Sequence, residues 1–450
     1  MLSTKENEKN GLLILHLSDV HFKEPVCLNL LTDPDHSVRD LLIRDIKKMV
    51  VSLGAVDAII ITGDIAYKAH KEEYDVALNW FHLVAEASQC SINSIYTVPG
   101  NHDINRITGS TLMVRSVRAL FDSSKSVLEK DNALREILAN QETGAQLLLP
   151  SGEYNKFAAR FSCDVDAKNP FWIETLELAP GWKLAIHGLT STLFSGPGDD
   201  KKGGLHTGDI QRSFSKEDGT IRLAAMHHPP EWMGDQDEFE DALNEHCSIQ
   251  LFGHKHRQRY IGADTCVKLA AGAVNPARNE PNWEPGYNFI QLSIDHAENV
   301  LCVESHLRKW QTSPDKFVAK LTLGDLEAFP HRIKLYVDPL PVKIEADTRK
   351  PETRGVEVLE EESLNLEEAK EVPMNNTLRR EIIFKFWELS ASERRYVMQD
   401  LNLLNEGDDN ISEPLRYRLA FERARERDAM REIEAKIESI RSKRNGDQNA

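Results

Sequence analysis

Short apolar runs, each ended by polar residues or glycine, recur through the first part of the chain. Residues 12–17, 58–62 and 94–98 are such runs, and their length and abrupt ends are typical of buried strands. The segments at 38–53 and 74–84 carry apolar residues at three-four spacing, which predicts helices packed on a sheet. This order predicts a parallel sheet with right-handed crossovers, in which the carboxyl ends of the strands share one edge.

The pattern becomes purely helical after the third strand. Residues 105–160 include an apolar stripe at Val114, Val117 and Phe121, and they predict a helical cap inserted into the domain. Because the cap follows directly on the third strand end, it is expected either to wall the site and select the substrate or only to cover the sheet.

Beyond the cap, strand-like runs are separated by glycine, proline and aspartate. The runs span residues 171–189, 221–227, 248–252, 266–270, 287–294 and 299–306. We expect them to form the second sheet of a sandwich. The predicted fold class is therefore α/β, a two-sheet β-sandwich flanked by helices, over residues 11–340. The glycine-rich stretch 195–204 is expected to be a surface loop or to lie over the site.

The C-terminal part has a different composition. Residues 341–375 are acidic and poor in aromatic residues, which predicts a linker. Residues 376–445 contain helices with apolar faces, and we interpret them as a helical module for a protein partner or self-association. The alternative is a tail that packs back on the catalytic domain. With the first interpretation, a chain that ends near Leu340 is expected to fold and keep its activity.

Composition narrows the classes of function. The net charge of -17 and the pI near 5.5 argue against broad electrostatic binding of nucleic acid, which needs clustered lysine and arginine. The six cysteines show no C-x-x-C pairing and are expected to be reduced thiols, which points to the cytoplasm. No apolar run approaches the roughly 18 residues of a membrane span, so we expect no membrane association.

Five strand-like runs end in side chains that bind metals. The motifs are Asp19-Val20-His21, Gly63-Asp64, Gly100-Asn101-His102-Asp103, His227-His228 and Gly253-His254-Lys255-His256. Each motif alone is common by chance, but five in this order, each closing a strand, are not. Their order resembles that of the calcineurin-like metallophosphoesterase family, over residues 11–305.

The resemblance implies a pair of metal ions that stabilise charge on phosphoryl oxygens and supply a bridging hydroxide. It implies that Asp19, His21 and His256 bind one ion, that Asn101, His227 and His254 bind the other, and that Asp64 bridges them. The mixed oxygen and imidazole set favours Mn, Fe or Zn. His227 and His228 compete for one position, and His227 is preferred because it is the first residue after the strand.

His102 follows a ligand directly and is the expected proton donor to the leaving alkoxide. The alternative is a histidine that only supports the ligands. The protein-phosphatase branch of the family carries an aspartate to orient this histidine, and Tyr67 stands in that place. The sequence is more similar to the branch of cyclic-nucleotide and glycerophosphodiester phosphodiesterases, which leaves the group that orients His102 undefined.

Three functions follow. The first is a cytoplasmic phosphodiesterase with two metal ions, acting on a nucleotide or other small phosphodiester. The second is a nuclease of the same fold that acts on DNA or RNA, against which the acidic charge balance argues. The third is a scaffold with a vestigial metal site that binds a partner through the helical tail, against which the complete set of ligand residues argues.

Overall fold

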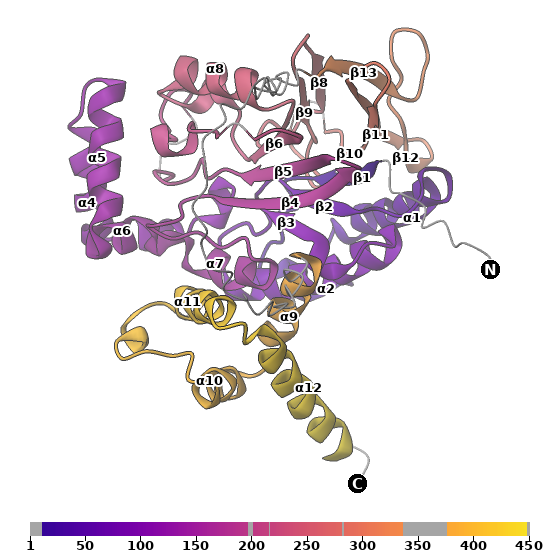
Figure 1. The fold of residues 1–450 in the computed structure, drawn as a ribbon. Coiled ribbons are helices and arrows are strands. Elements are labelled where there is room, and N and C mark those ends of the chain that lie inside the picture. Colours follow the sequence, from indigo (N-terminus) through magenta and orange to yellow (C-terminus); the bar gives the residue numbers. More distant parts are fainter. Residues whose placement is uncertain (1–10, 197–200, 216, 281–282, 336–375, 448–450) are drawn as a thin grey trace, which may run out of the picture.

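Two mixed β-sheets pack face to face at the centre of the molecule (Figure 1). The computed structural model describes residues 11–196, 201–215, 217–280, 283–335 and 376–447. In spatial order the first sheet contains β12 (Asp315–Ala319), β11 (Val300–Thr312), β10 (Gly286–Asp295), β1 (Leu12–Leu17), β2 (Ala58–Ile61) and β3 (Ile95–Thr97), with β13 (Phe329–Lys334) paired to β11. β1, β2 and β3 are parallel to one another, as predicted.

The second sheet has a parallel centre as well. In spatial order it contains β4 (Trp172–Ala179), β5 (Trp182–Gly188), β6 (Thr220–Met226), β7 (Ile249–Phe252), β9 (Val267–Ala270) and β8 (Arg259–Gly262). β5, β6, β7 and β9 run parallel, so their carboxyl ends also share one edge. The predicted fold class is confirmed.

Two helices connect the parallel strands of the first sheet. α1 (His36–Leu53) buries Val38, Leu42 and Ile46 along one face, and α2 (Lys71–Ser88) follows β2 in the same way. Apolar residues recur at three-four spacing in these helices because one face of each helix is buried against the sheet. α8 (Gln236–His246) lies between β6 and β7 on the other sheet.

The assignment of strands to sheets was wrong at two positions. The runs at 287–294 and 299–306 correspond to β10 and β11, which belong to the first sheet, where β10 pairs antiparallel with β1. The periodicity of a strand reports its buried faces, and it does not report which neighbour it pairs with. β8, β12 and β13 were not predicted at all.

Helices fill the region between β3 and β4. They are α3 (Arg106–Gly109), α4 (Leu112–Asp122), α5 (Val127–Ala139), α6 (Gln141–Leu148) and α7 (Gly152–Ala158). Figure 1 shows α4, α5 and α6 extending to one side of the sheets, and α7 beneath them. Ser126 begins α5 with a reciprocal capping box to Glu129, a local signal that fixes the start of a helix.

The C-terminal helices form a compact group with its own apolar core. They are α9 (Asn376–Trp387), α10 (Ala391–Asp400), α11 (Glu413–Glu426) and α12 (Met430–Asp447). Phe386, Val397, Phe421 and Ile433 are buried in this core. The predicted acidic linker, residues 341–375, lies outside the described residues.

The C-terminal group contacts the catalytic domain through α9 and α11. Arg380 of α9 is buried, and its guanidinium donates to the carbonyl oxygens of Asn93 (2.8 Å) and Ile95 (2.7 Å). These carbonyls lie at the edge strand β3, the strand that leads to Asn101. Arg380 also lies 3.4 Å from the buried carboxylate of Glu174. The structure therefore has the packed arrangement that the sequence left as an alternative.

Candidate metal centre

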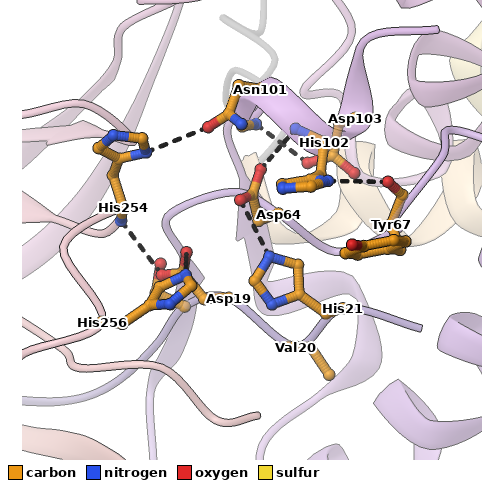
Figure 2. Close-up of polar contacts among 12 residues, drawn as sticks. Asp19, Val20, His21, Asp64, Tyr67, Asn101, His102, Asp103, His254 and His256 are labelled. Carbon is orange, nitrogen blue, oxygen red and sulfur yellow. Dashed lines mark hydrogen bonds and ion pairs between the residues drawn. The ribbon is translucent and has the colours of Figure 1, made fainter. Parts of the chain in front are cut away.

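The motif residues gather where the carboxyl ends of the strands of both sheets meet. Asp19 and His21 follow β1, Asp64 follows β2 and Asn101 follows β3. His227 follows β6, and His254 and His256 follow β7. Figure 2 shows side chains from both sheets turned toward Asp64. Candidate ligand atoms form two sets, each within 4.8 Å: one from Asp19, His21, Asp64 and His256, the other from His227, His228 and His254.

The first set contains two close imidazole–carboxylate pairs. His21 Nε2 lies 3.1 Å from Asp64 Oδ2, and His256 Nε2 lies 3.2 Å from Asp19 Oδ1. The Nδ1 atom of each ring has a separate partner. His21 Nδ1 lies 3.3 Å from the carbonyl oxygen of Asn275, and His256 Nδ1 lies 2.7 Å from Glu280 Oε1. Such outer contacts direct the inner Nε2 lone pair toward the centre.

The second set is organised around Asn101. Its Oδ1 lies 3.1 Å from His227 Nε2 and 3.1 Å from His254 Nδ1. His227 Nε2 also lies 3.4 Å from Asp64 Oδ2, while its Nδ1 lies 2.7 Å from the carbonyl oxygen of Thr62. Asp64 Oδ2 therefore faces one histidine from each set.

The His228 ring has different contacts from the ring of the adjacent His227. Its Nδ1 lies 2.8 Å from Ser191 Oγ, and its ring packs 4.3 Å from the His254 ring. His228 Nε2 is buried and has no hydrogen-bond partner within the described part of the chain. Since His227 faces both Asn101 and Asp64, the geometry favours His227 for the contested position.

The spacing of these atoms fits bound cations. Two donors that each lie about 2.1 Å from one ion, at angles of about 90–110°, are about 3.0–3.4 Å apart. The pairs above are separated by 3.1 to 3.4 Å. Asp19 Oδ1 is buried and has no hydrogen-bond partner among the described residues, although His256 Nε2 is near. A buried carboxylate oxygen of this kind is stabilised by a cation.

The backbone at the centre is held in an uncommon conformation. Asp19, His21, Asp64, His254 and His256 have positive φ angles, between 51° and 65°. Non-glycine residues rarely adopt this region, and such strain concentrates at functional sites. Close packing adds a further constraint at one glycine, because a Cβ atom on Gly100 would lie 2.1 Å from Asp64 Oδ1.

The structure identifies the group that orients His102. His102 Nδ1 lies 2.8 Å from the carbonyl oxygen of Tyr67, and the two rings stack at 4.7 Å. The backbone N–H of His102 donates to Asp64 Oδ1 (2.8 Å), and its ring meets the His21 ring edge-on at 5.0 Å. A backbone carbonyl thus acts where the protein-phosphatase branch has an aspartate. Burial lowers the pKa of His102, although the nearby Asp64 raises it.

The buried carboxylates attract positive charge. Burial alone would raise the pKa of Asp19, but His256 outweighs it and the pKa falls to about 2. Burial alone would lower the pKa of His227 and of His256, but Asp64 raises the first to about 9 and Asp19 raises the second to about 10. Protons on these rings supply the compensating charge, and bound cations would replace them.

Two carboxylates that support the centre were not predicted. Glu280 holds His256 and also accepts from the backbone N–H of Ala277 (2.9 Å). Asp103 accepts from the N–H groups of Ile65 (3.2 Å) and Gly100 (3.0 Å), which joins the two loops. Asp103 belongs to a recognised motif, whereas Glu280 lies in a loop with no local signal.

A third group of ligand-type residues lies apart from this centre. Asp131 of α5, His206 and Asp235 bring candidate ligand atoms within 4.8 Å. The guanidinium of Arg212 forms ion pairs with both carboxylates. Because Arg212 supplies the positive charge there, we interpret this group as a buried link between the cap and the segment after β5.

A two-sheet sandwich with imidazole and carboxylate side chains at its strand ends defines the metallophosphoesterase class of fold. The family model of calcineurin-like phosphoesterases matches residues 12–258, more than half of the chain, and the chain belongs to that family. The resemblance found in the sequence is confirmed, and the family is one of hydrolases. A second family model, the GTPase-associated adaptor domain, matches residues 378–439.

Individual relatives are distant. The uncharacterized metallophosphoesterase-like protein YydB of Bacillus subtilis is 28% identical over 124 residues, which are 28% of this chain and 24% of that protein. A solved Vps29 mutant from Entamoeba histolytica is 12% identical, with a TM-score of 0.27 over 72% of this chain and 100% of its own. A putative 5′-nucleotidase from Staphylococcus aureus is 12% identical, with a TM-score of 0.32 over 70% of this chain and 56% of its own.

The sequence also predicts that the chain has no membrane span and that its cysteines are reduced thiols. In the described ranges, no helix has both the length and the apolarity to cross a membrane. The six cysteines form no disulfide with one another in the described part of the chain, and five of them are buried.

Proposed function

We propose that the protein is a phosphodiesterase that uses two transition-metal ions to hydrolyse a nucleotide or another small phosphodiester. The observation that carries the proposal is the position of Asp64, whose Oδ2 lies 3.1 Å from His21 Nε2 and 3.4 Å from His227 Nε2. One carboxylate that faces both sets of ligands is suited to bridge two cations. The absence of disulfides among the six cysteines, all of which lie in the described part of the chain, suits a cytoplasmic protein.

We propose the ligand assignment that the resemblance to the family implies. Asp19, His21 and His256 would hold one ion, Asn101, His227 and His254 the other, and Asp64 both. When bound, such ions stabilise charge on phosphoryl oxygens and supply hydroxide at neutral pH. The ligand set suits Mn, Fe or Zn. Incubation with each metal, followed by assay of an aryl phosphodiester, tests the proposal.

His102 is proposed to donate a proton to the leaving alkoxide. The Tyr67 carbonyl holds its Nδ1, which leaves Nε2 for the substrate. Burial lowers the pKa of His102, so its protonated ring is a stronger acid, while a smaller fraction of the rings carries that proton at neutral pH. An aryl oxide leaves without help, whereas an alkoxide needs a proton, so the contribution of His102 depends on the leaving group.

His102→Ala is expected to slow hydrolysis of the dinucleotide TpT by about a hundred- to ten-thousandfold, with little loss on bis(4-nitrophenyl) phosphate. Steady-state rates on both substrates check this. His36→Ala, which changes a surface histidine of α1, is the matched control and should leave both rates intact. Equal losses on the two leaving groups would remove His102 from the role of acid.

A partner-binding role has independent support. The match of residues 378–439 to a GTPase-associated adaptor domain favours binding of a protein partner by the C-terminal helices. α9 and α11 contact the catalytic domain, so we propose that α10 and α12 carry the partner surface. A nuclease of the same fold stays the alternative for the catalytic domain, and the net charge of -17 favours small substrates over it.

A further inference from the structure

Trp232 lies beside His254, and two lysines lie over the Trp232 ring. Trp232 closes the short helix Pro230–Trp232 after β6, and its ring meets the His254 ring edge-on at 4.6 Å. Lys202 Nζ and Lys255 Nζ lie over the Trp232 ring, at 5.2 Å and 5.4 Å from its centroid. Cations over an indole ring are held by its quadrupole. The Trp232 ring therefore places two ammonium groups next to a proposed ligand.

The segment that carries Lys202 is fixed against this ring. The N–H of Leu205 donates to the carbonyl oxygen of Trp232 (3.1 Å), and the N–H of Gly234 donates to the carbonyl oxygen of Leu205 (2.6 Å). Leu205 and Met233 are both buried at this junction. Residues 201–204 of the glycine-rich stretch thus lie beside the Trp232 ring.

The charges there do not cancel. Glu231 forms an ion pair with Lys255, and its Oε1 lies 3.9 Å from Lys202 Nζ. One carboxylate therefore faces two ammonium groups. Positive charge gathered at one place in a chain of net charge -17 is suited to bind an anion.

We propose that Lys202 and Lys255, held on Trp232, bind a second phosphate of the substrate. The preferred substrates are then phosphodiesters with a further phosphate near the scissile one, such as 5′-phosphorylated dinucleotides. This inference rests on the proposed function, since it places the scissile phosphate at the ligands around Asp64. A simple ion-pair network would give no such preference.

Calorimetric titration of the full, manganese-loaded His102→Ala chain, which is expected to hydrolyse dinucleotides slowly, with pTpT and TpT tests this, because the two dinucleotides differ only in a terminal phosphate. We expect pTpT to bind at least about tenfold more tightly, as for a charge-assisted contact. Lys202→Met should reduce the ratio to below about threefold without changing the affinity for TpT. Lys201→Met removes the neighbouring exposed lysine and should keep the full ratio.

Equal affinity of the His102→Ala chain, with Lys202 intact, for the two dinucleotides would overturn the inference. So would an equal loss in Lys201→Met and Lys202→Met, which would indicate general surface charge. If neither dinucleotide binds while bis(4-nitrophenyl) phosphate is hydrolysed, the inference fails and the proposed function stands. If the metal-loaded chain hydrolyses no diester, the proposed function itself fails.

Discussion

Asp64→Asn is expected to lower hydrolysis of bis(4-nitrophenyl) phosphate by about a thousandfold or more while the chain stays folded. Asp64 faces both sets of candidate ligands, so loss of its charge would remove the group that we propose to bridge two cations. Metal-ion catalysis contributes several kcal/mol to stabilisation of the transition state, and about 4 kcal/mol corresponds to a thousandfold in rate. Steady-state kinetics with saturating manganese measure the loss.

The change at Asp64 has a direct control. Asp75→Asn removes a carboxylate on the exposed side of α2, where it pairs with Lys71, and should leave the rate unchanged. Circular dichroism and a thermal melt of both variants establish that they fold. Full activity in folded Asp64→Asn would show that Asp64 is not a bridging ligand.

Arg380→Ala is expected to destabilise the chain by about 3 kcal/mol or more. The guanidinium of Arg380 is buried, binds two carbonyl oxygens at β3 and lies 3.4 Å from Glu174. Removing one partner of a buried ion pair costs about 3–5 kcal/mol. Glu174 keeps its contacts with Arg379 and Asn376, so the lower end of this range is expected, mainly from the two carbonyl oxygens that lose their donor. Urea unfolding followed by fluorescence gives the difference in free energy of unfolding.

A surface arginine of the same helical group is the control. Arg395 pairs with Asp409 at the surface, and Arg395→Ala should leave the free energy of unfolding nearly unchanged. The sequence alone predicts that a chain ending near Leu340 folds and keeps its activity, and the contacts of Arg380 argue against this. Without α9, Glu174 and the β3 carbonyls lose these partners, so we now expect an unstable or insoluble product. A soluble and active truncated chain would contradict this.

The strands that carry the centre could be predicted from the sequence. β1, β2, β3, β6 and β7 are short apolar runs that end abruptly, and parallel strands necessarily bring their carboxyl ends to one edge. The ligand types at those ends, such as Asp19 and Asn101, needed no long-range information. Convergence of the motifs was therefore predictable before any side-chain position was known.

Other features depend on contacts that leave no local pattern. The carbonyl oxygen that orients His102 belongs to Tyr67, and every residue has such a group. Glu280 reaches His256 from a loop, and Arg380 reaches β3 across most of the chain length. β10 carries an ordinary strand pattern, so only its pairing with β1 places it in the first sheet. The spacing of residues along the chain does not predict contacts between residues that are distant in sequence.

Metal analysis of the purified full chain tests the central claim most directly. Mass spectrometry of protein equilibrated with Mn, Fe or Zn and then desalted gives the number of bound ions per chain, and Asp64→Asn is measured in parallel. The proposed centre predicts about two ions in the wild-type chain, fewer in Asp64→Asn, and loss of diester hydrolysis on chelation. A folded wild-type chain that retains no stoichiometric transition metal, or that hydrolyses diesters equally well after thorough chelation, would contradict it.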